Sequence, residues 1–374
     1  MDEKIKVCIL QNGLARGGTD TFVVNLVKFL DKNIFDITVV NSCNTEYCIV
    51  REPDILSEGV PVLRTGNANS SLKNRYLHFY RLYKILKKGH FDVFQTNIDL
   101  YNGPQLLIAW LAGVPMRVCH SHNSQQSKEI RNGRTIRISI YQNIMRWMCW
   151  RFSTRRCGCS EEAMNFLFKG RNWKQNNYPN IIYNGIDLVR FKKTVNKTLK
   201  KKELGLTASQ HILTVGQMVL QKNPEFIVKC ASQYLKEHEN VDFVWIGVGP
   251  YREQIDKLIH STTVENRFHL LGSRNDVNEV MQCCDTFFLP SNFEGLGIVL
   301  VEAQAAGLSC VASTKVPQLA DCGKVLYVSL QDSMDKWYKA LDSALSGYGV
   351  IDDKKLSAFS IENMSKQMTS VFTK

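Results

Sequence analysis

Short apolar runs rich in Val, Ile and Phe alternate with longer stretches whose apolar residues recur at helical spacing. This alternation is typical of α/β proteins with parallel sheets, in which helices cover both faces. In the first half we expect strands at Lys6–Gln11, Ile37–Asn41, Val93–Thr96, Arg117–His120 and Arg156–Ser160, and in the second half at His211–Val215, Val241–Ile246, Phe268–Leu270, Thr286–Leu289 and Ser309–Ala312. The expected helices include Asp20–Leu30, Tyr76–Lys87, Asn223–His238 and Ile298–Ala306.

The 374 residues are enough for two domains that each bury a core of their own. The pattern changes between Asn184 and Lys202, where a turn sequence leads into a Lys-rich segment. We therefore expect two doubly wound, Rossmann-like parallel sheets, one over residues 1–183 and one over residues 184–357. Ligands of such sheets bind beyond the carboxyl ends of the strands, so a cleft between two facing sheets is the expected site.

The segment from residue 291 to residue 307 carries the strongest chemical signal. Glu294 precedes a Gly-Leu-Gly sequence, and the apolar helix that follows carries a second carboxylate, Glu302. Glycines allow a ligand to approach the backbone closely, and the first amides of a helix favour a phosphate. Carboxylates accept hydrogen bonds from sugar hydroxyls. The segment therefore predicts a nucleotide-sugar site, although an ordinary Gly-rich turn into a buried helix, with Glu302 at the surface, is the alternative.

Charge is unevenly distributed along the chain. Of the formal net charge of +12, residues 1–183 carry +11, with 25 Lys and Arg against 14 Asp and Glu. The twelve cysteines form no C-x2-C pair, and the closest spacings are Cys157 to Cys159 and Cys283 to Cys284. We interpret them as reduced core residues of a cytosolic protein. The N-terminus lacks the apolar region of a signal peptide, and the longest apolar run, Leu106–Val114, is too short to cross a bilayer.

Basic and aromatic residues are interleaved between residues 117 and 156. The basic residues are Arg117, Lys128, Arg131, Arg134, Arg137, Arg146, Arg151, Arg155 and Arg156, against one acid, Glu129; the aromatic and Met residues are Tyr141, Met145, Trp147, Met148, Trp150 and Phe152. Cations with Trp at helical spacing indicate an anionic membrane surface as partner. The alternative places the aromatics in the core and the arginines in solvent. Nucleic acid is not an expected partner, because no groove-reading or base-stacking module is present.

Glu294 and Glu302 form an E-x7-E pattern within the strings Leu-Pro-Ser-x-Phe-Glu-Gly-Leu and Val-Leu-Val-Glu-Ala-Gln-Ala-Ala-Gly-Leu. This pattern resembles retaining glycosyltransferase family 4, in particular members that build bacterial capsule, exopolysaccharide and O-antigen chains. The resemblance covers nearly the whole chain and implies the GT-B fold. It also implies a hinge at Asn184-Gly-Ile-Asp187, preceded by Tyr183 where the family often has proline. The last helix, within residues 358–374, is expected to return to the N-terminal domain.

The resemblance also implies roles for single residues. Lys222 matches the lysine that binds the donor diphosphate, whereas Gln217 stands where the family usually has a charged arginine. The family's active-site histidine corresponds to His122 or His120, with His122 favoured. The expected acceptor and phosphate loop contains Gly17 and Gly18. The expected donor-binding residues are Gly216, Gln217, Lys222, Gly249, Arg274, Glu294, Gly295, Leu296, Gly297, Ile298 and Glu302, and the expected catalytic residues are Glu294, His122, His120 and Lys222.

The expected activity is retaining transfer of a hexose from a nucleotide diphosphate sugar, with UDP favoured by the resemblance, to a growing glycan on a polyprenyl-diphosphate lipid. No cofactor and no metal ion are expected, because Lys222 and the helix start can stabilise the leaving diphosphate. The expected location is the cytoplasmic face of the cell membrane. Two alternatives remain open: a GT-B epimerase or hydrolase of nucleotide sugars, and a non-catalytic protein that binds nucleotide sugars at the membrane surface.

Overall fold

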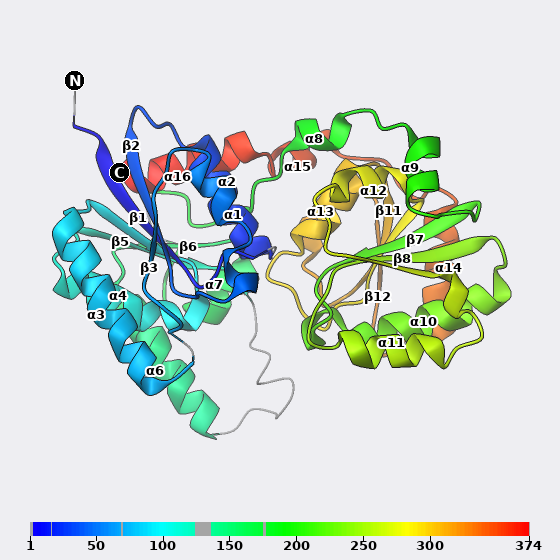
Figure 1. Ribbon diagram of the computed structural model, residues 1–374, viewed down its shortest axis with the longest axis horizontal. Coiled ribbons are helices and arrows are strands. Elements are labelled where there is room, and N and C mark those ends of the chain that lie inside the picture. The colour runs from blue at the N-terminus through cyan, green and yellow to red at the C-terminus, as the bar shows by residue number, and fades with distance from the viewer. Residues whose placement is uncertain (1–2, 16, 69, 124–135, 175–176, 374) are drawn as a thin grey trace. The chain divides into compact units, whose positions relative to one another are not determined.

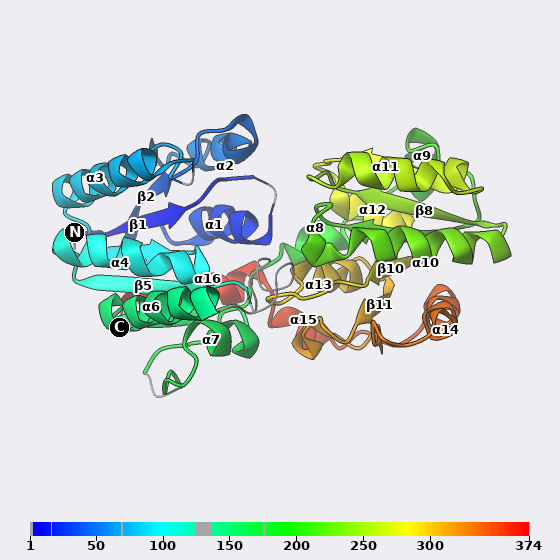
Figure 2. The same cartoon turned by 90° about the horizontal axis from the view of Figure 1, so that it is seen from below.

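The computed structural model describes residues 3–15, 17–68, 70–123, 136–174 and 177–373 (Figure 1). The chain divides into two compact units, Met1–Ile186 with Phe359–Lys374, and Asp187–Ala358. Each unit contains a six-stranded sheet whose paired strands all run parallel, and helices flank both sheets (Figure 2). The boundary after Ile186 lies close to the boundary expected after residue 183.

The first sheet has the strand order β3-β2-β1-β4-β5-β6. Its strands are β1 (Ile5–Gln11), β2 (Phe35–Asn41), β3 (Val62–Arg64), β4 (Val93–Thr96), β5 (Met116–Ser121) and β6 (Arg155–Gly158). The helices of this unit are α1 (Gly18–Phe29), α2 (Glu52–Leu56), α3 (Leu72–Gly89), α4 (Asn102–Leu111), α6 (Ile136–Phe152), α7 (Glu161–Leu167) and α16 (Ile361–Thr373), with short 3₁₀ turns η1 (Glu46–Ile49) and η2 (Asp99–Tyr101).

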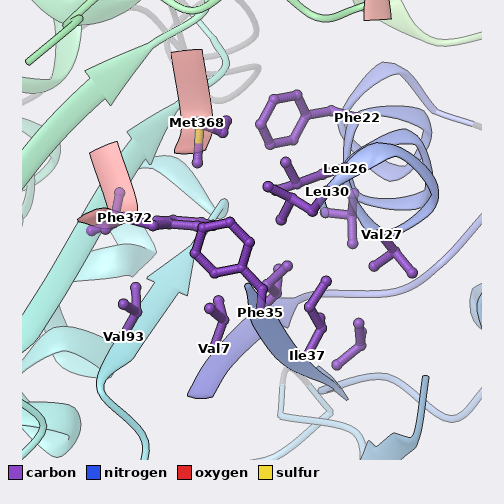
Figure 3. Packing of buried hydrophobic residues seen from close by; sticks show 14 of the residues in the cluster. Val7, Phe22, Leu26, Val27, Leu30, Phe35, Ile37, Val93, Met368 and Phe372 are labelled. Carbon is purple, nitrogen blue, oxygen red and sulfur yellow. The ribbon is translucent and has the colours of Figure 1, made fainter. Parts of the chain in front are cut away.

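Alternate residues of β1 supply two separate cores, because successive side chains of a strand point to opposite faces. Val7 packs on one face with α1 and α16, whereas Cys8 packs on the other with α3, α4 and α6. On the first face the ring of Phe35 meets that of Phe372 edge to face, with centroids 5.8 Å apart (Figure 3). Phe372 and Met368 lie on α16, so the last helix packs on the first unit, as expected.

The second sheet has the order β12-β11-β10-β7-β8-β9. Its strands are β7 (Gln210–Val215), β8 (Val241–Ile246), β9 (Phe268–Gly272), β10 (Thr286–Leu289), β11 (Ser309–Ser313) and β12 (Val325–Val328). The helices are α8 (Leu188–Lys192), α9 (Lys197–Glu203), α10 (Pro224–Glu237), α11 (Arg252–His260), α12 (Val277–Cys283), α13 (Ile298–Ala305), α14 (Met334–Leu345) and α15 (Asp353–Ser357), with 3₁₀ turns η3 (Leu220–Lys222), η4 (Glu265–Arg267) and η5 (Gln318–Ala320).

The segment that leaves the first unit is fixed at Gly185. A Cβ there would lie 2.7 Å from the Cα of Ile361, so a larger residue would push α16 away. The Gly185 carbonyl accepts a hydrogen bond of 2.8 Å from the Asn25 side chain. Asp187 then caps α8 by accepting from the Arg190 amide at 3.1 Å. These contacts explain why the turn sequence Asn-Gly-Ile-Asp stands at the end of the first unit.

Several details differ from the expectation. The edge strands β3 and β12 were not predicted, because each is only three or four residues long. The predicted strand Arg156–Ser160 is too long at its end, since β6 stops at Gly158. The Ser160 hydroxyl instead caps α7 by accepting from the Ala163 amide at 3.2 Å.

Candidate functional site

Two loops at the carboxyl edge of the second sheet are joined by their backbones. The Met218 amide donates to the Val248 carbonyl at 3.2 Å, and the Tyr251 amide donates to the Met218 carbonyl at 3.1 Å. A Cβ at Gly249 would lie 2.5 Å from the Met218 carbonyl oxygen, so glycine is required for this approach. The loops after β7 and β8 therefore form one rim, which includes the predicted donor residues Gly216, Gln217 and Gly249.

Lys222 and Glu294 form an ion pair beside this rim. The Lys222 ammonium lies 2.6 Å from Glu294 Oε1, and the two side chains are 17% and 6% exposed. Glu294 also accepts from the Ser291 hydroxyl at 2.7 Å and from the Gln221 side-chain amide at 3.1 Å. The aliphatic stem of Lys222 covers Gly216, whose Cβ would lie 3.0 Å from Lys222 Cε. Two predicted catalytic residues are thus in direct contact, and their charged groups are largely shielded from solvent.

Further hydrogen bonds hold the two loops that carry this pair. The Asn292 amide donates to the Gln221 carbonyl at 2.8 Å, and the Asn292 side chain donates to the Leu220 carbonyl at 2.7 Å. The Asn223 side chain donates to the Pro290 carbonyl at 3.2 Å. Asn223 adopts the left-handed conformation, with φ of 58°, and begins α10. The position of Lys222 relative to Glu294 therefore depends on backbone anchors as well as on the ion pair.

Glu294, Gly295 and Leu296 lead into helix α13 (Ile298–Ala305). Gly297 stands at its N-cap with φ of 78°, a conformation that favours glycine, and a Cβ there would lie 2.9 Å from Val316 Cγ1. Ile298 is the first residue of the helix, and the first amides of a helix have no partner within it. Their partial positive charge suits an anion close to the Lys222 ammonium.

The remaining predicted donor residues lie on α13 and after β9. Glu302 is half-buried on α13. The Arg274 guanidinium pairs with both oxygens of Asp276 at 2.7 Å and with Glu203 at 3.2 Å. Lys200 pairs with the same Asp276 carboxylate. The hydrogen bond from Arg274 holds the pKa of Asp276 well below its usual value. Arg274 thus belongs to an ion-pair network between α9 and the start of α12.

The histidine pair lies at the end of β5 in the first unit. The rings of His120 and His122 stack with centroids 4.3 Å apart, which confirms that they point to the same side of the strand. Phe22 of α1 meets the edge of the pair, 4.7 Å from the His120 ring. Burial lowers the pKa of His122 to about 3, although a hydrogen bond with Asn184 acts in the opposite direction. Burial also lowers the pKa of His120, so both rings are neutral near pH 7.

Polar residues after β4 hold the histidine loop in place. Asp99 Oδ1 accepts from the His122 amide at 2.7 Å and from the Asn123 amide at 3.1 Å. His122 Nε2 lies 3.3 Å from Asn97 Oδ1, whereas His120 makes no side-chain hydrogen bond to any described residue. Asp99 has a φ of 51°, a conformation uncommon outside glycine. Sequence reasoning missed Asp99 and Asn97, although their place directly after a buried strand was a usable signal.

Gly17 and Gly18 lie at the start of α1, after β1. Gly17 is the N-cap, and its amide donates to Asp20 Oδ2 at 3.0 Å. Asp20 Oδ1 accepts from the Gln11 side chain at 2.8 Å. Burial raises the pKa of Asp20, while its hydrogen bonds to Gln11 and Gly17 lower it. The loop that leads to α1 follows the carboxyl end of β1, and Asn97 follows that of the neighbouring strand β4, so the glycines and Asn97 share the carboxyl edge of the first sheet.

Several arginines of the basic segment stabilise the fold. Arg117 donates to the Phe152 carbonyl at 2.7 Å, Arg146 donates to the Phe166 carbonyl at 2.8 Å, and Arg156 lies over the Trp150 ring at 3.9 Å. The predicted membrane contacts of these residues are therefore replaced by internal ones. Arg137 and Arg151 are exposed. Lys128, Glu129, Arg131 and Arg134 lie outside the described residues.

The outer face of α6 is apolar and exposed. Ile136, Ile140, Ile144 and Trp147 are 81%, 55%, 49% and 51% exposed, and their spacing places them along one side of the helix. Tyr141 is also exposed, at 42%. No helix within the described ranges is long and apolar enough to cross a membrane. Among those same residues, no group of three or more His, Cys, Asp or Glu side chains is placed to hold a metal ion.

Two family models match the chain. Residues 16–190 match the model described as Glycosyltransferase Family 4, and residues 196–347 match the model described as Glycosyl transferases group 1. EpsF of Bacillus subtilis, a glycosyltransferase by name, is 29% identical over 91% of this chain and 87% of its own. The UDP-Gal:alpha-D-GlcNAc-diphosphoundecaprenol alpha-1,3-galactosyltransferase of Escherichia coli is 27% identical over 83% of this chain and 79% of its own.

A solved structure has the same fold. The structure of Anabaena HepE in complex with UDP and glucose superposes on 98% of this chain and 98% of its own, with a TM-score of 0.78 and 15% identity. This likeness, with two doubly wound parallel sheets, identifies the fold as GT-B.

Proposed function

The chain belongs to the family 4 glycosyltransferases of bacterial polysaccharide biosynthesis, and on that premise we propose that it transfers a hexose, with retention, from a UDP-sugar to a lipid-linked glycan. The Lys222–Glu294 pair beside the start of α13 carries this proposal. It combines a cation and helix amides for a diphosphate with a carboxylate for sugar hydroxyls. A UDP donor is supported by the name of the Escherichia coli relative and by the UDP complex of HepE.

Stabilisation of the departing diphosphate is the main chemical task in this proposal. Lys222 donates to the phosphate oxygens, and the amides of Ile298 and Val299 face the charge that develops on them. Gln217 adds a hydrogen-bond donor without charge, so Lys222 supplies the local cation. Because these groups need no metal ion, turnover should continue in EDTA.

Recognition of the sugars is assigned to the uncharged and carboxylate groups. Glu294 accepts from hydroxyls of the donor hexose, and Glu302 accepts from the ribose. His122 stays neutral, so its ring can exchange hydrogen bonds with sugar hydroxyls without introducing charge. No protein nucleophile is assigned. The acceptor hydroxyl attacks the anomeric carbon on the face that the diphosphate leaves, its proton passes to the departing phosphate oxygen, and the configuration is retained.

We assign the acceptor to a polyprenyl-diphosphate glycan at an anionic membrane surface on the cytoplasmic side. The name of the Escherichia coli relative contains a diphosphoundecaprenol acceptor. The apolar face of α6, with Ile140, Ile144 and Trp147 exposed beside Arg137 and Arg151, suits insertion at the level of lipid headgroups. This assignment moves the expected membrane contact from the internal arginines to the outer face of α6.

The transfer is tested by incubating purified protein with UDP-, GDP- and ADP-sugars, with and without membrane lipid extract, and following nucleotide release by NMR. A single donor cleaved slowly alone and faster with lipid, in EDTA as well as in magnesium, is the expected result. An isomerised nucleotide sugar would indicate an epimerase, and binding without turnover would indicate a non-catalytic protein. Dependence on a divalent ion would overturn the metal-free assignment.

Membrane docking is tested by flotation with vesicles that contain phosphatidylglycerol. The double variant Ile140→Ser, Trp147→Ser should lose binding that the native protein shows at low salt. Val350→Ser, at a residue 83% exposed in the second unit, is the matched control and should bind normally. Equal flotation of all three proteins would show that the membrane contact lies elsewhere.

A further inference from the structure

Two cysteines differ from all the others in their exposure. All twelve cysteines lie within the described residues, and ten of them are buried. Cys43 and Cys48 are half-exposed, and they flank the exposed residues 44–47 after β2. Their backbones meet at one side chain, because the Cys43 amide donates to Asn41 Oδ1 at 3.0 Å and the Asn41 side chain donates to the Cys48 carbonyl at 2.9 Å. Cys43 Sγ also lies 3.5 Å from the Thr45 hydroxyl. The pair is therefore accessible to a small thiol reagent, in contrast to the buried cysteines.

The two thiols have unequal acidity. Partial burial raises the pKa of Cys43, but hydrogen bonds from Cys48, Thr45 and Asn44 outweigh it and lower the pKa below the ordinary value. Burial and then the hydrogen bond to Cys43 raise the pKa of Cys48 to about 11. A thiol pair with one readily formed thiolate and one protonated neighbour is the arrangement in which disulfide exchange starts at the first and is completed by the second.

Cys48 is also in contact with the loop that follows β1. A Cβ at Gly13 would lie 3.1 Å from Cys48 Sγ, so the sulfur packs directly on that glycine. The Leu14 amide donates to the Cys48 carbonyl at 2.7 Å, and the Arg51 amide donates to the Leu14 carbonyl at 2.8 Å. A displacement of Cys48 must therefore change the hydrogen bonds of Leu14, which lies on the loop leading to Gly17 and Gly18.

We propose that Cys43 and Cys48 form a reversible thiol–disulfide pair whose oxidation changes the conformation of the loop after β1. The oxidant is a small-molecule disulfide such as oxidised glutathione. The Cys43 thiolate attacks one sulfur of this disulfide and expels the first small thiolate, which takes up a proton. Cys48 then loses its proton and attacks Cys43 Sγ, expelling the second thiolate. Two protein thiols lose two electrons and two protons, and the small disulfide becomes two thiols.

The chemical step is tested in buffers with increasing ratios of oxidised to reduced glutathione, by acid quenching, alkylation of free thiols and peptide mass spectrometry. The native protein should lose two hydrogens and form one Cys43–Cys48 disulfide, which dithiothreitol reverses, while the other ten cysteines stay alkylatable after unfolding. Cys48→Ser should stop at a glutathione adduct on Cys43, and Cys43→Ser should form little adduct. A stable glutathione adduct on the native protein, or oxidation of buried cysteines first, would overturn the proposal.

The structural consequence is measured by hydrogen exchange of reduced and oxidised protein. Faster exchange is expected in the peptide that contains Leu14, whereas the peptide that contains Trp245 in the second unit is the control and should not change. Unaltered exchange at Leu14 after complete oxidation would refute the effect on the loop. Neither measurement depends on turnover, so the thiol pair is tested independently of the proposed function.

Discussion

The basic half of the chain has an uncharged site at the carboxyl edge of its sheet, whereas the nearly neutral half has a site with charged groups. Residues 1–183 have a net charge of +11, yet the His120–His122 site is kept neutral by burial. Residues 184–374 hold 22 Lys and Arg against 21 Asp and Glu, a net charge of +1, yet the Lys222–Glu294 site contains a partly buried ion pair. The net charge of a domain therefore does not report the chemistry of its site. In the proposed function, the second unit supplies charged groups for the donor, and the first unit supplies neutral histidines.

Removing the cation of the second site should have the largest effect. Lys222→Ala deprives the leaving diphosphate of its charged donor and should lower kcat by about 10²- to 10³-fold. The folded state should persist, because the loops that carry the pair are held by Asn292 and Asn223. The control is Lys229→Ala, an exposed lysine on α10. Steady-state kinetics and thermal melts check both variants, and unchanged kcat in Lys222→Ala would place diphosphate stabilisation elsewhere.

Neutralising the carboxylate of the same pair should have a smaller effect. Glu294→Gln keeps a carbonyl oxygen for the Ser291 hydroxyl but removes the charge that faces Lys222. We expect kcat/KM to fall by roughly 10- to 100-fold, because a charge-assisted hydrogen bond becomes an ordinary one.

A double-mutant cycle with Lys222→Ala separates the two roles of Glu294. If Glu294 acts only by orienting Lys222, Glu294→Gln should cost nothing further in the Lys222→Ala background. If Glu294 also contacts the donor sugar, as proposed, part of the loss should remain in that background.

The two histidines of the neutral site should respond differently. His122 Nε2 lies near Asn97, and its backbone is held by Asp99, whereas the His120 side chain has no hydrogen-bond partner among the described residues. His122→Ala should lower kcat/KM by about 10-fold and also lower the melting temperature, because the ring is buried against His120 and Phe22. His120→Leu should leave kcat/KM nearly unchanged, because an unpaired buried polar ring is replaced by an apolar side chain. The reverse outcome would assign the active-site histidine to His120.

Strand positions could be predicted from short local patterns, whereas most residues of the site loops were predicted from the family resemblance. The buried central strands have uninterrupted apolar runs, and in parallel sheets the site loops follow the carboxyl ends of those strands. The edge strands β3 and β12 could not be found this way, since Val62–Arg64 and Val325–Val328 are too short to stand out from the surrounding loops. Contacts between loops could not be predicted from the sequence either. The Lys222–Glu294 pair joins residues that only the folded sheet brings together.

The basic segment, residues 117–156, was interpreted as a membrane contact, and the structure supports this for only some of its residues. Its arginines and aromatics were predicted to face a membrane, but Arg117, Arg146 and Arg156 turn inward to carbonyls or an indole ring. Arginine has five donors and an apolar stem, so it can satisfy internal carbonyls while its sequence neighbours are exposed. Only the folded helix separates these residues from the exposed Ile140 and Trp147.

The smallest expected effect is on the pH dependence of stability. Burial places the pKa of His122 at about 3 in the folded protein, below its ordinary value of 6.5, and the pKa of His120 is also lowered. Between these values the unfolded chain binds protons that the folded protein does not. The free energy of unfolding therefore falls as pH decreases from about 6.5 towards 3, by on the order of 1 kcal/mol per pH unit for His122, and His120 acts in the same direction.

Urea unfolding of the native protein and of the double variant His120→Leu, His122→Asn at pH 7, 6 and 5 isolates this contribution. Burial raises the pKa of Asp99, which acts in the opposite sense at acidic pH, but Asp99 is present in both proteins, so its contribution largely cancels in the difference. The native protein should lose more stability than the variant over this range. Parallel curves would mean that the histidines take up protons in the folded state. The edge of the first sheet would then carry charge, and its contrast with the Lys222–Glu294 site would disappear.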